Sequence, residues 1–197
     1  MLIKNEFDVA APVEKVWDFF SNIPQVAACL PGTELTGDLG GDKYKGQVAI
    51  RMGPVRLQFG GTAHITERDE AAHRIVVDAT GSEAKGRGQA SMVVTATLTR
   101  SGHGTKVAVA QDLQLAGAAA QYGRGMITDV SSVLMSDFSR NLADRIDRAG
   151  RGESLDAGPA AQARSASGLA LGLRAARMAL TRVFRRFFVP YDKTYAS

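Results

Sequence analysis

The histidines that could support acid–base or metal chemistry are few and scattered along this chain. They are His64, His73 and His103, and no two have the His-x-x-x-His spacing that places two metal ligands on one helix face. We expect His64 on the polar face of a strand, and His73 and His103 in turns where the imidazole is solvated. The pattern therefore predicts no histidine-based metal or catalytic site.

The carboxylates and the single cysteine also give a weak chemical signal. Glu67, Asp69 and Glu70 fall in a predicted turn, so we expect them to be solvated. Asp112, near the end of a predicted strand, is the one acid that could face the mouth of a cavity. Cys29 cannot form an internal disulfide or a cysteine-based metal site, and a lone cysteine is more often a small buried hydrophobe than a nucleophile.

A glycine-rich stretch, Gly81–Arg87 (GSEAKGR), resembles a phosphate-binding loop only in its glycines. An arginine stands where such a loop has its lysine, and no Ser or Thr follows it. We therefore reject nucleotide binding at this stretch. Without a catalytic constellation, the sequence favours a binding protein over an enzyme.

The clearest functional signal lies in residues 165–197. Six Arg and Lys residues against one aspartate give this segment a net charge of +5, which leaves −1 for residues 1–164 out of the total of +4. Residues 167–188 have helical periodicity, and Pro190 ends the pattern. The apolar side comprises Leu169, Leu173, Leu180, Val183, Phe184 and Phe187, with Phe188 beside it, and the arginines are Arg174, Arg177, Arg182, Arg185 and Arg186.

This predicted tail helix is suited to lie on a membrane rather than to cross it. Each arginine near the bilayer centre costs about 2.5–3.5 kcal/mol, whereas at the surface it gains about 1 kcal/mol from anionic lipid. The first residues carry charges and resemble no signal peptide. We therefore predict binding to an anionic membrane surface on the cytoplasmic face of the cell membrane. Docking in a partner protein's groove and packing on the domain are the alternatives.

Nucleic acid fits less well as a partner, because the sequence of residues 1–164 shows no additional basic patch.

Residues 1–149 are interpreted as one α+β domain, followed by a linker at 150–164 that is rich in Gly and Ala. Alternation of polar and apolar residues predicts a strand at 2–10, and helical spacing predicts short helices at 13–22 and 23–30. Further strands are expected at 43–52, 55–66, 74–80, 88–100 and 105–115, followed by a long helix from 121 to about 149. Strands with one polar face, joined by tight turns, indicate an antiparallel sheet solvated on one side.

The inner face of this sheet carries unusually small side chains. They are Gly46, Gly61, Ala63, Ala79 and Ala96. A twisted sheet that wraps around the long helix would leave unfilled volume beside them. The sequence therefore predicts an internal cavity.

Several short motifs carry a resemblance to a known family. They are Ala11-Pro12-x-x-x-Val16-Trp17, Cys29-Leu30-Pro31-Gly32, Gly53-Pro54-Val55, Gly60-Gly61, Lys85-Gly86-x-Gly88 and the closing long helix. With the order of elements, they resemble the START/Bet v 1-like (SRPBCC) helix-grip superfamily. Within it, residues 1–148 resemble the CoxG family of carbon monoxide dehydrogenase subunits.

The resemblance implies a non-catalytic accessory protein with an apolar cavity. Such a protein would recruit a CO dehydrogenase-type molybdenum hydroxylase to the membrane. Its ligand would be a lipid-soluble electron acceptor, a quinone such as menaquinone or ubiquinone, through which electrons reach the quinone pool. Two alternatives stay open: a polyketide cyclase-like or hydrolase-like enzyme of the same superfamily, and a membrane-docking adaptor without a ligand.

The cavity residues follow from the predicted faces, with plain core packing as the alternative for each. The sheet is expected to contribute Tyr44, Val48, Ile50, Leu57, Phe59, Val94, Leu98, Leu113 and Leu115. The mouth is expected to be closed by Trp17, Phe20 and Leu30, and the floor to be formed by Met126, Ile127, Val130, Leu134 and Phe138. Candidate polar partners for quinone carbonyls are Tyr44, Gln111 and Tyr122.

Overall fold

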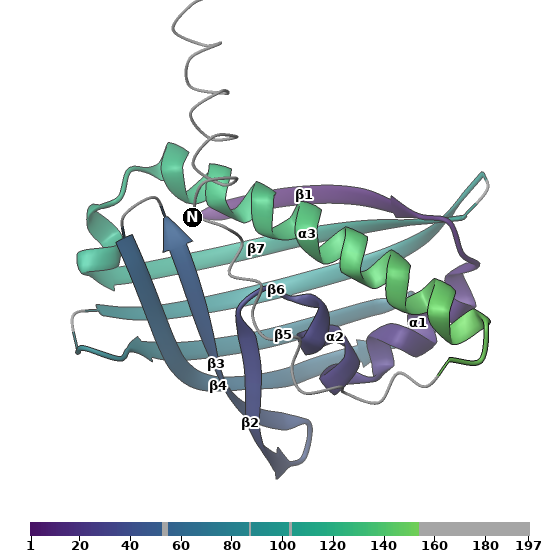
Figure 1. Ribbon diagram of the computed structural model, residues 1–197, viewed down its shortest axis with the longest axis horizontal. Coiled ribbons are helices and arrows are strands. Elements are labelled where there is room, and N and C mark those ends of the chain that lie inside the picture. Colours follow the sequence, from purple (N-terminus) through teal and green to yellow (C-terminus); the bar gives the residue numbers. More distant parts are fainter. Residues whose placement is uncertain (53–54, 87, 103, 154–197) are drawn as a thin grey trace, which may run out of the picture.

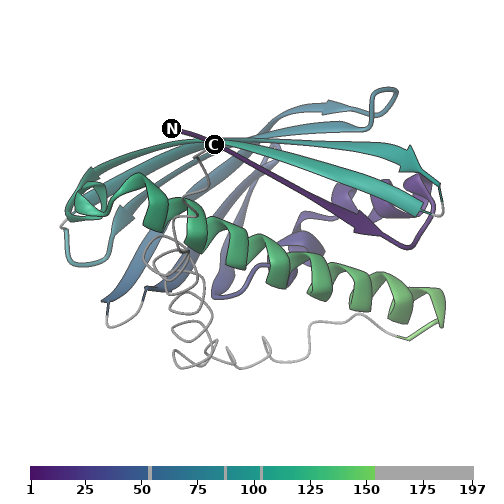
Figure 2. The same ribbon diagram turned by 90° about the horizontal axis from the view of Figure 1, so that it is seen from above.

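The protein is a curved antiparallel sheet that holds one long helix against its concave face (Figures 1 and 2). The computed structural model describes residues 1–52, 55–86, 88–102 and 104–153. The seven strands are β1 (Leu2–Val9), β2 (Thr33–Gly40), β3 (Lys43–Met52), β4 (Val55–Asp69), β5 (Arg74–Glu83), β6 (Gly88–Ser101) and β7 (Gly104–Gly117), in the order β1-β7-β6-β5-β4-β3-β2. The helices are α1 (Val13–Ser21), α2 (Ile23–Cys29), a 3-10 turn η1 (Ala118–Gln121) and α3 (Arg124–Gly150).

The two short helices connect β1 to β2 and share one residue at their junction. Pro12 precedes the first turn of α1, where its missing N–H costs no hydrogen bond. Asn22 ends α1 and caps α2, because its side-chain oxygen accepts the backbone N–H of Gln25 at 3.2 Å. The apolar face of α1 is buried against the sheet and α3.

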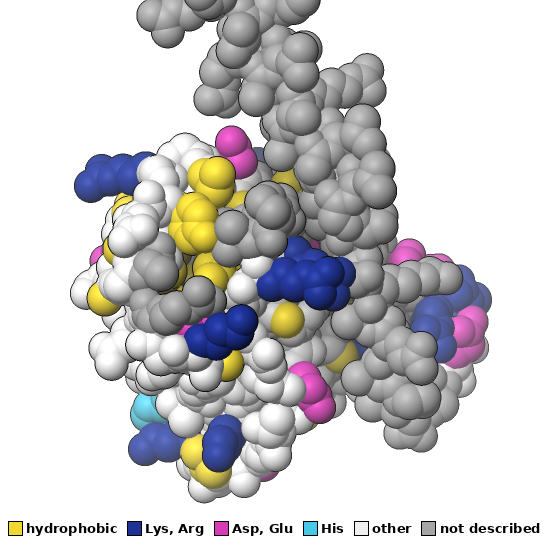
Figure 3. Space-filling model, turned by 60° about the vertical axis from the view of Figure 1, so that its left-hand side comes forward, with side chains coloured by type: hydrophobic (Ala, Val, Ile, Leu, Met, Phe, Trp, Pro, Cys, Tyr) yellow, Lys and Arg dark blue, Asp and Glu magenta, His cyan; other side chains and the backbone are white. Residues whose placement is uncertain are grey.

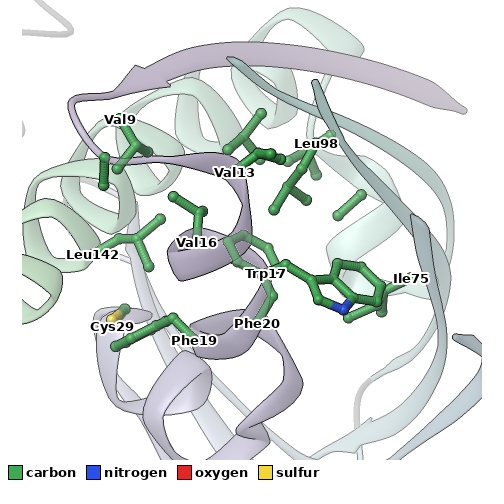
Figure 4. Close-up of a cluster of buried hydrophobic side chains, with 14 of the residues drawn as sticks. Val9, Val13, Val16, Trp17, Phe19, Phe20, Cys29, Ile75, Leu98 and Leu142 are labelled. Carbon is green, nitrogen blue, oxygen red and sulfur yellow. The ribbon is translucent and has the colours of Figure 1, made fainter. Parts of the chain in front are cut away.

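The larger cluster of buried core residues lies at the end of the molecule where α1 lies (Figure 4). There Val16 and Cys29 from the short helices, Leu142 from α3 and Val107 from β7 are 0% exposed. The buried Thr105 hydroxyl donates to the Ala11 carbonyl oxygen at 2.8 Å and joins β7 to the start of α1.

The strand register places the small and the apolar side chains of β3 and β4 on the same face. Tyr44 pairs with Ala63, Gly46 with Gly61 and Val48 with Phe59. Because side chains alternate across a strand, these residues all lie on the concave side of the sheet. The alternation that predicted the inner face is therefore confirmed for both strands.

The predicted strands, short helices and long helix are present, but the predicted topology omitted one strand. Edge strand β2 has Gly37, Asp38 and Gly40, which are residue types that disfavour strands, and its pairing with β3 shifts register at two places. No regular alternation was therefore visible in its sequence.

Some predicted boundaries were also wrong. β4 continues to Asp69, so Glu67 and Asp69 are in a strand and not in a turn. Glu67 is paired with Arg74 across the β4–β5 hairpin. The long helix α3 begins at Arg124, after the separate turn η1, and it includes Gly150, the first residue of the predicted linker.

Candidate ligand cavity

A cavity of about 480 Å³ lies between α3 and the concave face of the sheet. This volume falls within the range of about 300–1,000 Å³ that is usual for small-molecule sites. Its wall takes residues from α1, α2, all seven strands, η1 and α3. The cavity is therefore enclosed by the whole fold and is not confined to one loop.

The small residues on the inner face do line this cavity, as expected. Gly46, Gly61, Ala63, Ala79 and Ala96 are all on its wall. Gly61 has a second role, because a Cβ at this position would lie 1.9 Å from the Thr80 carbonyl oxygen of the neighbouring strand. The close approach of β4 to β5 therefore also requires glycine at position 61.

Most of the predicted cavity residues lie on the wall. They are Phe20, Leu30, Tyr44, Val48, Ile50, Leu57, Phe59, Val94, Gln111, Leu113, Leu115, Tyr122, Ile127, Val130, Leu134 and Phe138. Tyr44 and Tyr122 are half-buried there.

The placement of Trp17, Leu98 and Met126 in the cavity was wrong. The Trp17 side chain extends from α1 into the packed core, and its ring lies edge-on to His73 at a centroid separation of 5.4 Å. Leu98 faces the same side as Val94, but it is four residues further along β6 and is 2% exposed in that packed core. Met126, on the first turn of α3, faces outwards and is 49% exposed.

The edge-on contact between Trp17 and His73 corrects the expectation that His73 is solvated. Its ring is half-buried against Trp17, in a turn where its own φ is 47°. His64 lies within β4, as expected, and is half-buried. His103 lies outside the described residues.

Other wall residues were missed by the sequence analysis. Thr33 and Leu35 come from β2, the strand that the periodicity did not show, and Ile23 and Val26 come from α2. Ser131 was identifiable, because it is four residues after Ile127 and therefore on the same face of α3. Ser131 was not predicted because it is polar and the residues of the cavity floor were expected to be apolar.

Two polar side chains of the wall, Ser131 and Gln111, form a connected chain of hydrogen bonds with Asn5, which lies outside the wall. The Asn5 amide on β1 donates to the Ser131 hydroxyl at 3.4 Å, and that hydroxyl donates to the side-chain oxygen of Gln111 on β7 at 3.2 Å. Gln111 is 7% exposed and Ser131 is 8% exposed.

This chain fixes the orientation of the Gln111 amide. Because Oε1 is held by Ser131, the other end of the amide, Nε2, is the donor that remains, and it has no partner among the described residues. The described residues hold no fully buried side-chain nitrogen or oxygen without a partner, so this nitrogen is accessible from the cavity, and the wall offers it there as a hydrogen-bond donor.

The described part of the wall contains no carboxylate, imidazole, ammonium, guanidinium or thiol. The expectation for Asp112 was wrong, because its side chain is 60% exposed and forms an ion pair with the terminal amino group of Met1 at 3.3 Å. Asp112 neighbours Gln111 on β7, and successive residues of a strand face opposite sides. Asp112 is therefore on the outer face of the sheet.

Cys29 is a buried residue next to the cavity and not part of its wall. Its thiol donates to the Gln25 carbonyl oxygen at 3.3 Å, and burial raises the pKa of the thiol from 9.0 to about 11, although the charge of Arg145 lowers it slightly. The thiolate, which is the reactive form, is therefore scarce at neutral pH.

Two absences among the described residues bear on other functions. These residues contain no group of three His, Cys, Asp or Glu side chains that could hold a metal ion. None of their helices combines the length and the apolar character needed to cross a bilayer. Most of the predicted linker and the whole predicted tail helix lie outside the described residues.

Comparison with solved structures shows the same fold at low sequence identity. A conserved protein from Geobacillus kaustophilus is similar with a TM-score of 0.68 and 20% identity, covering 76% of this chain and 97% of that one. TTHA0849 from Thermus thermophilus gives 0.55 and 15%, covering 76% and 99%. The ZhuI aromatase/cyclase from Streptomyces sp. R1128 gives 0.56 and 13%, covering 78% and 99%.

The family assignment comes from the sequence itself. No curated protein matches the chain. The sequence profile of the carbon monoxide dehydrogenase subunit CoxG matches residues 6–147, which include every described helix and strand except the ends of β1 and α3. The helix-grip arrangement of sheet and long helix agrees with this match. The chain therefore belongs to the CoxG family of carbon monoxide dehydrogenase subunits.

Proposed function

We propose that this protein is a non-catalytic carrier of a quinone and a recruitment factor for a CO dehydrogenase-type molybdenum hydroxylase at the cytoplasmic face of the cell membrane. One observation supports the ligand assignment above others. The cavity wall is almost entirely apolar, and it presents an oriented hydrogen-bond donor to the cavity, the Gln111 amide nitrogen.

A quinone ring matches this distribution of polar and apolar surface. It is flat and largely apolar, and its polar atoms are carbonyl oxygens and, in ubiquinone, methoxy oxygens, all of which accept hydrogen bonds and donate none. A ligand carbonyl placed against the Gln111 nitrogen would accept its hydrogen bond in a mostly apolar cavity, where one oriented polar group fixes the ligand's position. Tyr44 and Tyr122 lie on the same wall and could reach a second carbonyl. Menaquinone and ubiquinone both meet these requirements.

The accessory role rests on family membership and on the chemistry of the wall. The family is described as a subunit of carbon monoxide dehydrogenase, so a molybdenum hydroxylase of that type is the partner we propose. A cyclase-like activity would need a general acid or base beside the substrate, and tyrosine is the only titratable residue type on the described wall. The wall therefore favours a carrier over an enzyme.

Membrane attachment is assigned to residues 165–197. The segment combines an apolar helical periodicity with a net charge of +5, which suits an anionic lipid surface. A carrier anchored there would reach both the quinone pool and an enzyme bound at the membrane.

A transfer assay between two vesicle populations tests the carrier function. Donor vesicles contain menaquinone, acceptor vesicles are heavy and quinone-free, and the full-length protein is added in catalytic amounts. The proposal predicts menaquinone transfer well above the spontaneous rate. If transfer stays at the spontaneous rate while the protein sediments with the vesicles, the protein is an adaptor and not a carrier.

A further inference from the structure

The charged side chains at the open end of the cavity differ from those elsewhere on the domain. Most arginines of the described residues have a carboxylate partner: Arg68 with Asp42, Arg74 with Glu67, Arg100 with Glu14, Arg140 with Asp137, and Arg148 and Arg151 with Glu153. Arg145 donates to the Gln25 side chain. Arg51, Arg56 and Arg124 have no ion pair or hydrogen bond from their side chains among the described residues.

These three unpaired arginines lie at the same end of the molecule. Arg51 and Arg56 face each other across the β3–β4 hairpin, beside its turn. Leu57 and Phe59, which follow in β4, form a buried cluster with Ala119 of η1. Arg124 begins α3 shortly after η1. We refer to Arg51, Arg56 and Arg124 as the arginine rim.

Apolar side chains reach the surface at this end of the cavity. The wall residues Ile50, Leu115, Tyr122 and Ile127 are half-buried here, and Met126 beside them is 49% exposed. Figure 3 brings this end forward and shows hydrophobic side chains at the surface with Lys and Arg side chains near them. The arginine rim therefore borders an apolar opening.

Both placements of charge in the rim are unfavourable in the isolated domain. Like charges directly opposite on paired strands repel each other, as for Arg51 and Arg56. A cation in the first turn of a helix, as for Arg124, opposes the positive end of the helix dipole, and no acidic residue occupies that turn. Bound anions would relieve both.

The acidic residues near the rim do not neutralise it. Glu83, at the end of β5, is buried and already accepts the backbone N–H of Lys85 at 3.0 Å. Asp129 is the first acid of α3 and is exposed, and it forms no ion pair with the arginine rim among the described residues. The arginines remain in excess.

We propose that the arginine rim docks the cavity opening onto anionic lipid headgroups, separately from the tail. Guanidinium groups bind phosphate oxygens in pairs of hydrogen bonds, and fluid headgroups can adjust to three arginines without a matched surface. Met126 and the half-exposed wall residues then meet the acyl boundary, as on an interfacial helix. An apolar ligand passes between bilayer and cavity without crossing water. The proposal depends neither on the ligand's identity nor on the tail.

The test uses the full-length protein with an environment-sensitive fluorophore at position 126. Met126→Cys supplies the thiol, and buried Cys29, whose pKa is about 11, stays unlabelled. Leu39→Cys, on β2 and 57% exposed, supplies the control site. Vesicles contain either phosphatidylglycerol with phosphatidylcholine or phosphatidylcholine alone. We expect a blue shift of the probe at 126 only with the anionic vesicles, and no shift at 39.

A charge-matched pair of variants separates the rim from general electrostatics. In R51Q/R56Q/R124Q, each lost arginine should lower vesicle partitioning about fivefold, so the three together lower it on the order of a hundredfold. The control K4Q/K43Q/K45Q removes the same charge from exposed lysines outside the rim and should partition nearly as the parent does. Circular dichroism checks that both variants are folded.

Several outcomes would overturn this proposal. They are no shift at 126, an equal shift at 39, an equal loss in the two variants, and a shift at 126 that appears only with added CO dehydrogenase-type enzyme. The last would assign the rim to a protein partner. The probe shift at position 126 reports on the rim, whereas the loss of sedimentation on deletion of residues 165–197 reports on the tail, so failure of the rim and failure of the tail are distinguishable.

Discussion

The Ser131 hydroxyl on α3 donates to the Gln111 side-chain oxygen on β7 at 3.2 Å, inside the wall of the cavity. This contact joins the long helix to the sheet and leaves the Gln111 amide nitrogen as a donor towards the cavity. Both residues are less than one-tenth exposed. The position of a bound carbonyl group would therefore be set by two rigid elements.

Replacing Gln111 with leucine should remove the preference for carbonyl ligands. Menadione binding should weaken about 5- to 30-fold, equivalent to about 1–2 kcal/mol, because the ligand carbonyl loses its donor. Binding of 2-methylnaphthalene, which has the same carbon skeleton without carbonyls, should change little. Isothermal titration of both ligands with both proteins measures this. Equal weakening for the two ligands would mean that Gln111 only shapes the cavity.

The same donor predicts a preference for the oxidised ligand. A hydroquinone must place two hydroxyl hydrogens, whereas the Gln111 group that is free towards the ligand is a donor, and its oxygen already accepts one hydrogen bond from Ser131. We expect the reduced naphthoquinone to bind about tenfold more weakly, equivalent to about 1.4 kcal/mol. Anaerobic titration with menadione and menadiol checks the ratio. Tighter binding of menadiol would contradict the orientation assigned to the amide.

Filling the cavity should abolish ligand uptake without unfolding the domain. Ala79→Phe places a large ring among the small residues of the inner face, where free volume exists. We expect at least a tenfold loss of naphthoquinone binding, since the ring displaces ligand. The matched control is Val93→Phe on the neighbouring strand, where the side chain is 44% exposed. Loss of binding in both variants, or in neither, would argue against a ligand in this cavity.

Cys29 should make the folded state less stable in alkali. Its folded pKa of about 11 lies above the ordinary 9.0, so between these pH values the folded protein holds more protons than the unfolded chain. The free energy of unfolding therefore falls as pH rises through this range, by about 2 kcal/mol at most. Urea denaturation at pH 8 and pH 11 measures the change. Cys29→Ala should show a smaller decrease, and an identical decrease would assign the effect to other groups.

The tail should account for most of the attraction to anionic vesicles. Deletion of residues 165–197 removes a net charge of +5 together with the predicted apolar face. We expect sedimentation with phosphatidylglycerol-containing vesicles to drop to the weaker level supported by the arginine rim. The control is the full-length protein in high salt, which weakens electrostatic attraction but retains apolar insertion. Unchanged sedimentation of the truncated protein would contradict the role assigned to the tail.

The sequence predicted which face of each strand and helix points inwards better than it predicted how deeply each residue is buried. Alternation in β3 and β4 placed Tyr44 and Phe59 correctly on the inner face. The alternation could not distinguish Leu98, in the packed core, from Val94, on the cavity wall. Both face the same side of β6, and only the position of α1 places Leu98 in the core. Periodicity describes rotation about an element and carries no information on what packs above each turn.

The functional contacts depended on tertiary register, which a single sequence does not contain. The hydrogen bond from Ser131 to Gln111 requires the position of α3 along the sheet. Likewise, the sequence suggested no basic patch in the body, because Arg51 and Arg124 are far apart in the chain. The buried cluster between β4 and η1 brings the β3–β4 hairpin, which carries Arg51, close to the start of α3, which carries Arg124.

Mass spectrometry of the purified protein tests most directly whether the cavity carries a quinone in the cell. The full-length protein is purified gently from its native membranes, and its organic extract is analysed for isoprenoid quinones, with the Ala79→Phe variant prepared in parallel. A quinone carrier should yield a near-stoichiometric quinone from the parent protein and almost none from the variant. An extract of the parent that contains no quinone, or equal trace amounts in both proteins, would contradict the carrier function.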